Sequence, residues 1–282
     1  MTRIDTGTDE LLCEIVQRVA VVTLNKPHKK NALGDILTPA LRALLPQLEV
    51  RSDVGCVMIT GAGNAFCSGG DVSEMGSGTR PGAPVPGLEQ RIADLTEKQR
   101  ALTGRLYHLT KPTVAALPGA AAGAGLSIAL ACDLRVAADD AFMITAFSNI
   151  GLSGDYGATW FLPRLVGLAR AKTLFYRSPR LSATQAQEIG LVDRVFTAAT
   201  FRAEALLYAA DIANGPTQAL GKLKLNLQTG LTQSLDDSLA LEARHMIESG
   251  RGDEAREAIA AFMQKRKPRF HPDNQHNAGE HP

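Results

Sequence analysis

The chain has 282 residues, a length that fits either one large α/β domain or about two average domains. Hydrophobic residues make up 45% and charged residues 21%, which excludes a mainly disordered or fibrous chain. Basic residues exceed acidic ones by a single charge, so the chain lacks the basic excess that is typical of nucleic-acid-binding proteins.

The four cysteines, Cys13, Cys56, Cys67 and Cys132, are scattered and form no Cys-x-x-Cys pair. This spacing predicts neither a disulfide framework nor a metal site, and it favours a reducing compartment. The N-terminal residues lack the basic and then apolar run of a signal peptide, and no uncharged apolar run reaches about 18 residues. We therefore expect a cytoplasmic protein with no membrane contact.

The first sixty residues read as strand, helix and strand. Residues 11–15 and 19–24 are two largely apolar runs of strand length on either side of the turn at 16–18, and they predict a hairpin. Asp35 is expected to cap the helix that follows, and Pro46 is expected to end or kink it. Residues 56–60 predict a short buried strand. This order is typical of a parallel sheet with crossover helices.

A second unit of the same kind follows a loose segment. Residues 76–87 are dominated by Gly, Pro and Ser and predict a mobile loop or lid. Leucine and isoleucine then recur at helical spacing over residues 88–109. The second unit comprises a strand at 113–117, a helix of small residues at 123–131 and a strand at 134–137.

From residue 158 onward the chain reads as mostly helical. Ser182 is expected to cap a helix over 183–189, which ends before Gly190. Two amphipathic helices and a polar tail that we expect to be disordered complete the chain. These last segments are residues 233–248, 253–265 and 271–282.

Two glycine-rich turns, each after a strand, are the first candidate site. In the first, Ala65–Asp71, Gly69 and Gly70 allow a backbone to approach a ligand, and free N–H groups there could bind a developing oxyanion. Taken alone, the segment favours a plain tight turn in which Asp71 opens a short helix over 71–75.

The second turn, Pro118–Ser127, does not meet the dinucleotide pattern Gly-x-Gly-x-x-Gly. Its small residues favour close helix–strand packing, and they also leave N–H groups exposed near Ala124. Two such turns are what a two-donor oxyanion hole requires.

Asp155 lies in a third glycine-rich segment, residues 150–160, just before an apolar helix. Its position alone favours a helix cap over a catalytic role.

Together these segments resemble the crotonase (enoyl-CoA hydratase/isomerase) superfamily. The resemblance covers roughly residues 10–270, and the surroundings of Asp155 look most like the 1,2-epoxyphenylacetyl-CoA isomerase group, although Gly154 replaces the proline usual there. The other matching segments are 19–33, 110–116, 131–134, 181–193 and 261–270.

The resemblance implies a spiral of ββα repeats over residues 1–200 and C-terminal helices over 201–270 that build a homotrimer or a dimer of trimers. It implies an acyl-CoA thioester substrate, whose enolate oxygen would be held by the amides of Gly70 and Ala124. Coenzyme A would enter as part of the substrate, with no separate cofactor and no metal.

The resemblance also bears on the reaction. Ser127 and Phe147 occupy the positions of the two hydratase glutamates, and neither side chain can do two-carboxylate acid/base work. Asp155 is therefore expected to carry a proton between Cα and Cγ of an enoyl-CoA, with a pKa raised by burial beside Phe147 and Trp160. An enoyl-CoA hydratase or lyase and a catalytically weak acyl-CoA-binding protein remain alternatives.

The resemblance also implies a set of residues that contact CoA or substrate. Two of them, Phe262 and Lys265, would do so from a neighbouring subunit. For each lysine alone a solvated surface is the plainer interpretation. These positions are Lys29, Asn31, Ala32, Leu33, Ser68, Gly69, Gly70, Asp71, Gly123, Phe147, Tyr156, Phe262 and Lys265.

Overall fold

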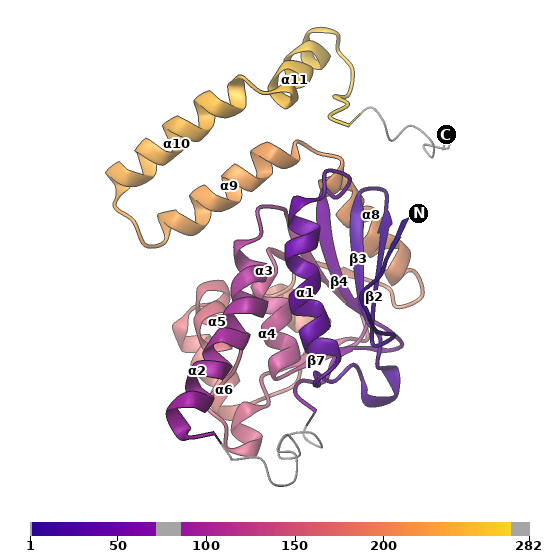
Figure 1. Ribbon diagram of the computed structural model, residues 1–282, viewed down its shortest axis with the longest axis vertical. Coiled ribbons are helices and arrows are strands. Elements are labelled where there is room, and N and C mark those ends of the chain that lie inside the picture. The colour runs from indigo at the N-terminus through magenta and orange to yellow at the C-terminus, as the bar shows by residue number, and fades with distance from the viewer. Residues whose placement is uncertain (1, 72–85, 272–282) are drawn as a thin grey trace.

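The computed structural model describes residues 2–71 and 86–271. Two sheets form its centre: a seven-stranded sheet in the order β1-β2-β3-β4-β6-β8-β11 and a four-stranded sheet in the order β10-β9-β7-β5. Helices pack around them, and the last three project away from the sheets (Figure 1). The short helix expected over 71–75, most of the loop expected over 76–87 and nearly all of the tail lie outside the described residues.

The strands are β1 Thr2–Ile4, β2 Leu11–Val16, β3 Val19–Leu24, β4 Cys56–Gly61, β5 Ala65–Cys67, β6 Thr113–Leu117, β7 Ala120–Ala122, β8 Leu134–Ala138, β9 Phe142–Ile144, β10 Leu181–Ser182 and β11 Arg194–Phe196. The α-helices are α1 Leu37–Val50, α2 Leu88–Gln99, α3 Arg105–His108, α4 Ala124–Ala131, α5 Ala158–Val166, α6 Leu168–Arg177, α7 Ala183–Glu188, α8 Phe201–Ala213, α9 Thr217–Gly230, α10 Leu235–Gly250 and α11 Asp253–Met263. The 3₁₀-helices Pro27–Lys29 and Phe147–Ile150 and the π-helix Arg100–Gly104 complete the set.

The predicted hairpin and both strand–helix–strand units are confirmed. Strands β2 and β3 pair antiparallel, and Gln17 and Arg18 turn between them with positive φ angles of 50° and 66°, as a type I′ turn requires. Strand β3 pairs parallel with β4, β4 with β6, and β6 with β8. Parallel pairing brings the carboxyl ends of successive strands to one edge, where connecting turns gather.

The predicted N-cap of α1 was wrong, and Pro46 does not end the helix. The N-cap position falls on Ile36 rather than Asp35, and Pro46 lies inside a helix that continues to Val50. A proline removes one backbone hydrogen bond, but a buried leucine stripe holds this helix on the sheet. That stripe consists of Leu37, Leu41, Leu44, Leu45 and Leu48.

The helix predicted over 88–109 is confirmed as a continuous helical segment from Leu88 to His108, in which the π-helix Arg100–Gly104 joins α2 to α3. The apolar stripe of α2 is not buried, with Leu88 69% and Ile92 50% exposed, whereas Leu102 in the π-helix and Leu106 in α3 are fully buried. Helical spacing therefore identified the segment correctly but not where its packing begins.

The region after residue 158 is mostly helical, as predicted, but it also contributes two short strands. Strand β10 extends the smaller sheet beside β9, and β11 closes the larger sheet beside β8. Ser182 caps α7 as expected, in a capping box completed by Gln185. Strands of two or three residues carry too little pattern to be found from sequence.

Helix α9 precedes the two predicted C-terminal helices, which appear as α10 and α11 (Figure 1). Many large apolar side chains on the three helices are exposed in the single chain. Within the described residues, none of the helices has the length and apolar character needed to cross a bilayer. The exposed apolar residues of the three helices are Leu223, Leu225, Leu227, Leu235, Leu239, Met246, Ile247, Ile259, Phe262 and Met263.

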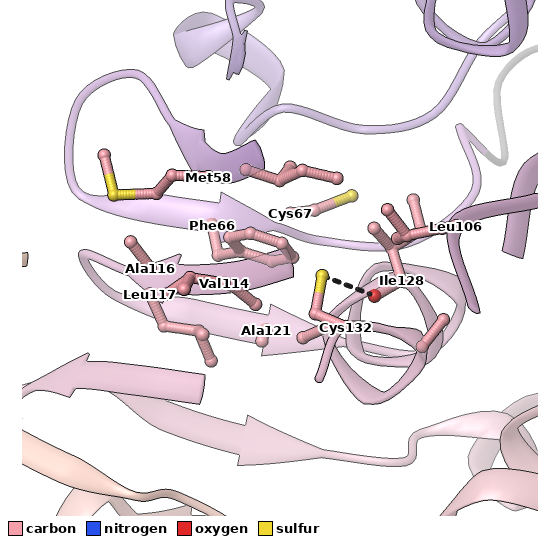
Figure 2. Packing of buried hydrophobic residues seen from close by; sticks show 14 of the residues in the cluster. Met58, Phe66, Cys67, Leu106, Val114, Ala116, Leu117, Ala121, Ile128 and Cys132 are labelled. Atoms are coloured by element: carbon pink, nitrogen blue, oxygen red, sulfur yellow. Dashed lines mark hydrogen bonds between the residues drawn. The ribbon is translucent and has the colours of Figure 1, made fainter. Parts of the chain in front are cut away.

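The core between the two sheets centres on Phe66 of β5 (Figure 2). Its ring lies among side chains from β4, β6 and β7, and Ile128 and Cys132 of the α4 segment lie at the same place. All four cysteines are buried as free thiols, and the Cys132 Sγ lies 3.6 Å from the Ile128 carbonyl oxygen. This packing fixes β5 and α4, the elements that carry the two glycine-rich turns.

Candidate active site

The two glycine-rich turns lie against each other. Strands β5 and β7 are parallel neighbours, so the turns that follow them leave the sheet at the same edge. A Cβ atom built on Gly69 would lie 3.1 Å from the Ala122 carbonyl oxygen and 3.6 Å from the Ala124 amide nitrogen. Gly69 also has a φ of 100°, which favours glycine. The structure therefore brings the first and second predicted turns together.

The Gly70 amide faces away from the strand-like contact that holds its turn. Leu33 forms a parallel bridge with Gly70: the Leu33 N–H donates to the Gly69 carbonyl, and the Asp71 N–H donates to the Leu33 carbonyl. Successive N–H groups of extended backbone point to opposite sides. The Gly70 N–H therefore points away from Leu33, and within the described residues it donates no hydrogen bond.

Ala124 is the first residue of α4, so its N–H has no partner one turn earlier in the helix. Gly123 precedes it with a φ of 51° and a ψ of −126°, a conformation that an L side chain rarely adopts. Ala124 itself is 5% exposed. A helix start with an unused amide at a nearly buried position is suited to an anion.

A basic loop, Lys26–Lys30, follows β3 and is tied to the first turn by ion pairs. Lys29 Nζ lies 2.7 Å and Lys26 Nζ lies 3.3 Å from Asp71 Oδ2, and the Asp71 side chain is buried. Ser68 adds a hydrogen bond from its amide to the Lys30 carbonyl and another from its hydroxyl to the Lys29 carbonyl. The loop predicted to contact CoA therefore adjoins the turn that carries Gly70.

Asn31 is the anchor of this loop. Its side chain is fully buried, accepts a hydrogen bond from the Lys26 amide and donates to the carbonyls of Ala62 and Ala65. The backbone amides of Asn31, Ala32 and Leu33 are all used internally. At these three predicted CoA-binding positions, backbone contacts to a ligand would have to come from carbonyl oxygens.

Asp155 lies in the loop just before α5, whose N-cap is Gly157, and it is half-buried. Its Oδ1 accepts hydrogen bonds from Gln99 Nε2 and from the Tyr156 amide, both at 2.8 Å. The carbonyl of Asp155 accepts from the Ala158 amide, so the main chain caps α5 while the side chain turns elsewhere. The plain helix-cap interpretation is therefore wrong for the carboxylate.

Burial raises the pKa of Asp155 above its ordinary value, and the hydrogen bonds from Tyr156 and Gln99 oppose the rise. The rings expected to flank it stack on other rings: Phe147 on Phe175, and Trp160 on Tyr107 and Phe161. Trp160 is 37% exposed. The pKa of Asp155 is therefore raised by burial, which is the predicted direction.

Ser127 and Phe147, which the resemblance assigns to the two hydratase glutamate positions, are both buried. The Ser127 hydroxyl donates to the Asp155 carbonyl at 2.9 Å, with the Gly123 carbonyl at 3.2 Å. Ser127 therefore connects α4 to the backbone of Asp155. Tyr156 is buried, with a φ of 51°, and burial together with the Asp155 charge raises the pKa of its phenol.

Phe262 and Lys265 do not join this group within one chain. Phe262 is 81% exposed on α11, and Lys265 follows the helix with a φ of 54°. Figure 1 places α11 at the opposite end of the molecule from β7, which leads into the second turn. Among the described residues, no cluster of three His, Cys, Asp or Glu side chains could hold a metal ion.

Gln99 and the contact made by Ser127 were not foreseen from the sequence. Gln99 lies four residues after Leu95 and seven after Ile92, on the same face of α2, and this spacing was the one available signal. Its partner Asp155 is 56 residues away along the chain. Only the packing of α2 beside α5 reveals the pair.

The class of protein follows from comparison with known families. Residues 14–273 match the family model described as enoyl-CoA hydratase/isomerase. The chain therefore belongs to the enoyl-CoA hydratase/isomerase family, the crotonase superfamily that its motifs resemble, and it acts on CoA thioesters.

Individual relatives agree on the family but differ in activity. The chain is 36% identical to 1,2-epoxyphenylacetyl-CoA isomerase of Escherichia coli K12, with 92% of this chain and 97% of the relative covered. It is 37% identical to a probable enoyl-CoA hydratase of Rhodobacter capsulatus, with 91% and 96% covered. A solved structure of a putative enoyl-CoA hydratase/isomerase from Mycobacterium abscessus has a TM-score of 0.85 and 30% identity, with 93% and 99% covered. The predicted α/β crotonase fold is confirmed.

Proposed function

We propose that this protein is an acyl-CoA isomerase that moves a double bond, or opens and rearranges a ring epoxide, next to a thioester. Within the proposal, Asp155 is the acid/base group and the amides of Gly70 and Ala124 form the oxyanion hole. The observation that carries it is the Asp155 carboxyl group, half-buried and held on one oxygen. The resemblance, which assigns Ser127 and Phe147 to the two hydratase glutamate positions, supports it.

The oxyanion hole supplies the stabilisation. Removal of a Cα proton puts negative charge on the thioester oxygen. The amides of Gly70 and Ala124 sit in touching turns, and neither donates elsewhere in the described chain, so both are free to hold that oxygen. A preorganised donor of this kind contributes about 3 kcal/mol to the transition state.

Asp155 would move the proton in two steps. It removes a proton from Cα of a 3-enoyl thioester, which gives a dienolate, and then returns that proton to Cγ as the double bond moves to Cα–Cβ. A carboxyl group with a raised pKa suits this task because it must both accept and release a proton. No cofactor besides the CoA of the substrate is required.

The CoA portion would approach along the basic loop. Lys29 and the exposed Lys30 lie beside the first turn, and Ser68 at the turn itself is exposed. Phe262 and Lys265 would complete the site from a second copy of the chain, which fits their exposure in a single copy.

An enoyl-CoA hydratase or lyase that uses Asp155 and water is the nearest alternative, since several relatives are described as probable hydratases. Ser127 argues against it, because its hydroxyl is already engaged with the Asp155 backbone. In such a hydratase, Asp155 alone would have to activate the water and protonate Cα.

The test is to incubate the purified protein with 2-enoyl- and 3-enoyl-CoA thioesters, and with 1,2-epoxyphenylacetyl-CoA, and to identify the products by mass spectrometry and absorbance. We expect isomerised thioesters without 3-hydroxyacyl product. The Asp155→Asn variant should lose at least about 100-fold in kcat. Asp139→Asn is the matched control, since Asp139 also accepts a backbone amide bond but is exposed.

Three results would contradict the proposal. A 3-hydroxyacyl-CoA product would establish the hydratase. Tight acyl-CoA binding with no turnover of any thioester would establish a binding protein. Wild-type isomerisation by folded Asp155→Asn would remove Asp155 from the mechanism.

A further inference from the structure

Gln99 is the one side chain of the described residues that hydrogen-bonds the Asp155 carboxyl group. We infer that Gln99 is a positioning residue for this carboxyl group: its amide fixes Oδ1 and so presents Oδ2 to the substrate. The inference rests on the proposed role of Asp155 and adds a residue that acts through it.

The hydrogen bonds of Asp155 divide unevenly between its two oxygens. Gln99 Nε2 and the Tyr156 amide both donate to Oδ1 at 2.8 Å. Oδ2 accepts no hydrogen bond from the described residues. Two donors on one oxygen fix the χ2 torsion of the side chain and leave the second oxygen for proton transfer.

A primary amide is suited to a group that gains and loses a proton. Its NH₂ donates to the carboxylate, and after a rotation of the amide its oxygen can accept from the carboxylic acid. A lysine or arginine at residue 99 could donate only, and would hold Asp155 ionised. Gln99 can stay in contact through both protonation states.

The backbone places Gln99 for this contact. The π-helix Arg100–Gly104 starts at the next residue, and such segments insert one extra residue per turn and recur at functional sites. The Thr103 hydroxyl donates to the Gln99 carbonyl at 3.3 Å and so supports the junction. Ser127 holds the Asp155 backbone from the other side.

Gln99 also lines a cavity of about 490 Å³ beside Gly157, with a wall formed by Tyr107, Trp160 and Phe161. The three rings stack edge-on or tilted at centroid distances of 5.1–5.6 Å. An apolar wall reduces the competition of water for the amide. Gln228 lines the same cavity but donates to the Tyr107 carbonyl, so it offers a matched control.

Few charged groups act on Asp155. Tyr156 adjoins it and is coupled to its charge, and Arg42 acts on Tyr156 in turn. Helices α2 and α4 present the neutral side chains Gln99 and Ser127 to it. A change in its titration after substitution of Gln99 can therefore be assigned to the lost hydrogen bond.

The experiment compares Gln99→Met, Gln99→Glu and Gln228→Met in steady-state isomerisation across pH. Met keeps the size of Gln but donates nothing, so we expect kcat to fall roughly 10-fold with KM within about twofold. Because Gln99 stabilises the ionised carboxylate, the acid limb of the kcat profile should move to higher pH, and further still in Gln99→Glu, which adds a like charge.

Gln228→Met should keep both kcat and the wild-type pH profile. The inference is overturned if Gln99→Met keeps the wild-type kcat and acid limb, or if Gln228→Met reproduces its effects, since the role would then be cavity packing. Asp155→Asn separates this failure from that of the proposed function. An inactive Asp155→Asn with a normal Gln99→Met refutes only the positioning role, whereas a fully active Asp155→Asn refutes the proposed function.

Discussion

At the scale of single residues, the site is held by hydrogen bonds that leave its proposed working atoms unengaged. The Gly70 and Ala124 amides donate no hydrogen bond within the described residues, and Asp155 is fixed through one carboxylate oxygen. Half-burial of an ionised carboxylate opposes folding, since desolvation disfavours its charged form. Function and stability therefore conflict at Asp155.

This conflict predicts that Asp155→Asn is more heat-stable than the wild type at pH 7. The folded pKa of Asp155 is raised above the unfolded value, so the folded state holds the proton more tightly and stability falls as pH rises through that interval. Asparagine carries no charge and keeps an acceptor for Gln99 and the Tyr156 amide. The gain in melting temperature should vanish below the unfolded pKa, and calorimetry at neutral and acidic pH measures it. An equal gain at both pH values would contradict the argument.

At the scale of elements, the contact between β5 and α4 holds the two turns together. A Cβ atom built on Gly125 would lie 2.4 Å from the Cys67 carbonyl oxygen and 2.7 Å from its Sγ, closer than any real contact. The first turn of α4 can therefore approach β5 only because residue 125 has no side chain. The small residues of this turn allow close helix–strand packing, and the same packing brings the Ala124 amide beside the first turn.

Gly125→Ala should accordingly lower the free energy of unfolding by about 1–3 kcal/mol. It should also lower kcat, because the Ala124 amide would move away from the first turn. Gly250→Ala is the control, since nothing lies within 4 Å of a Cβ there and alanine favours the helix, so stability should change by less than about 1 kcal/mol. Urea denaturation of both variants measures the difference. A Gly125→Ala protein with wild-type stability would mean that β5 and α4 can separate without strain.

At the scale of the whole molecule, α9 is fastened to the sheet by one partly buried network. Lys224 Nζ lies 2.9 Å from Asp133 Oδ2, and the same oxygen accepts from the amide and hydroxyl of Thr113 in β6. The Lys224 side chain is 9% exposed. This network ties the projecting C-terminal helices to the end of a central strand.

Lys224→Met should lower the free energy of unfolding by about 1–3 kcal/mol, because it removes a charged donor from a shielded carboxylate. Lys222→Met is the matched control on the same helix. Its partner Glu248 is exposed, so no measurable change is expected. Chemical denaturation with an intrinsic fluorescence signal compares the two. Equal losses would indicate that the stem of the lysine, rather than the ion pair, fastens α9.

The exposed apolar residues of the C-terminal helices lead to a prediction about assembly. Helices α9 and α10 alone enclose a groove of about 920 Å³ lined by Leu223, Leu227, Leu239 and Met246. Apolar surface on this scale favours burial against further chains. We expect light scattering to give three or six times the 30.0 kDa mass of one chain. A monomer at micromolar concentration would contradict this prediction and leave Phe262 without a role in the site.

The fold family and the two turns could be predicted from the sequence, because both depend on local features. Strand and helix periodicity, glycines where side chains do not fit, and the order of short motifs all lie within a few residues of one another. The prediction that Ser127 and Phe147 occupy the two hydratase glutamate positions likewise rests on short motifs in the sequence. These are properties that a chain expresses before it packs.

Which side chains contact one another depends on tertiary packing and could not be predicted. Packing buries the leucine stripe that holds α1 past Pro46, places a π-helix within the helix predicted over 88–109, and sets Gln99 against Asp155. The reason is physical: a contact between residues 56 positions apart depends on how two helices are placed against a sheet, and no local spacing encodes that placement. The family was thus readable in the chain, whereas the environment of its one proposed catalytic carboxylate was not.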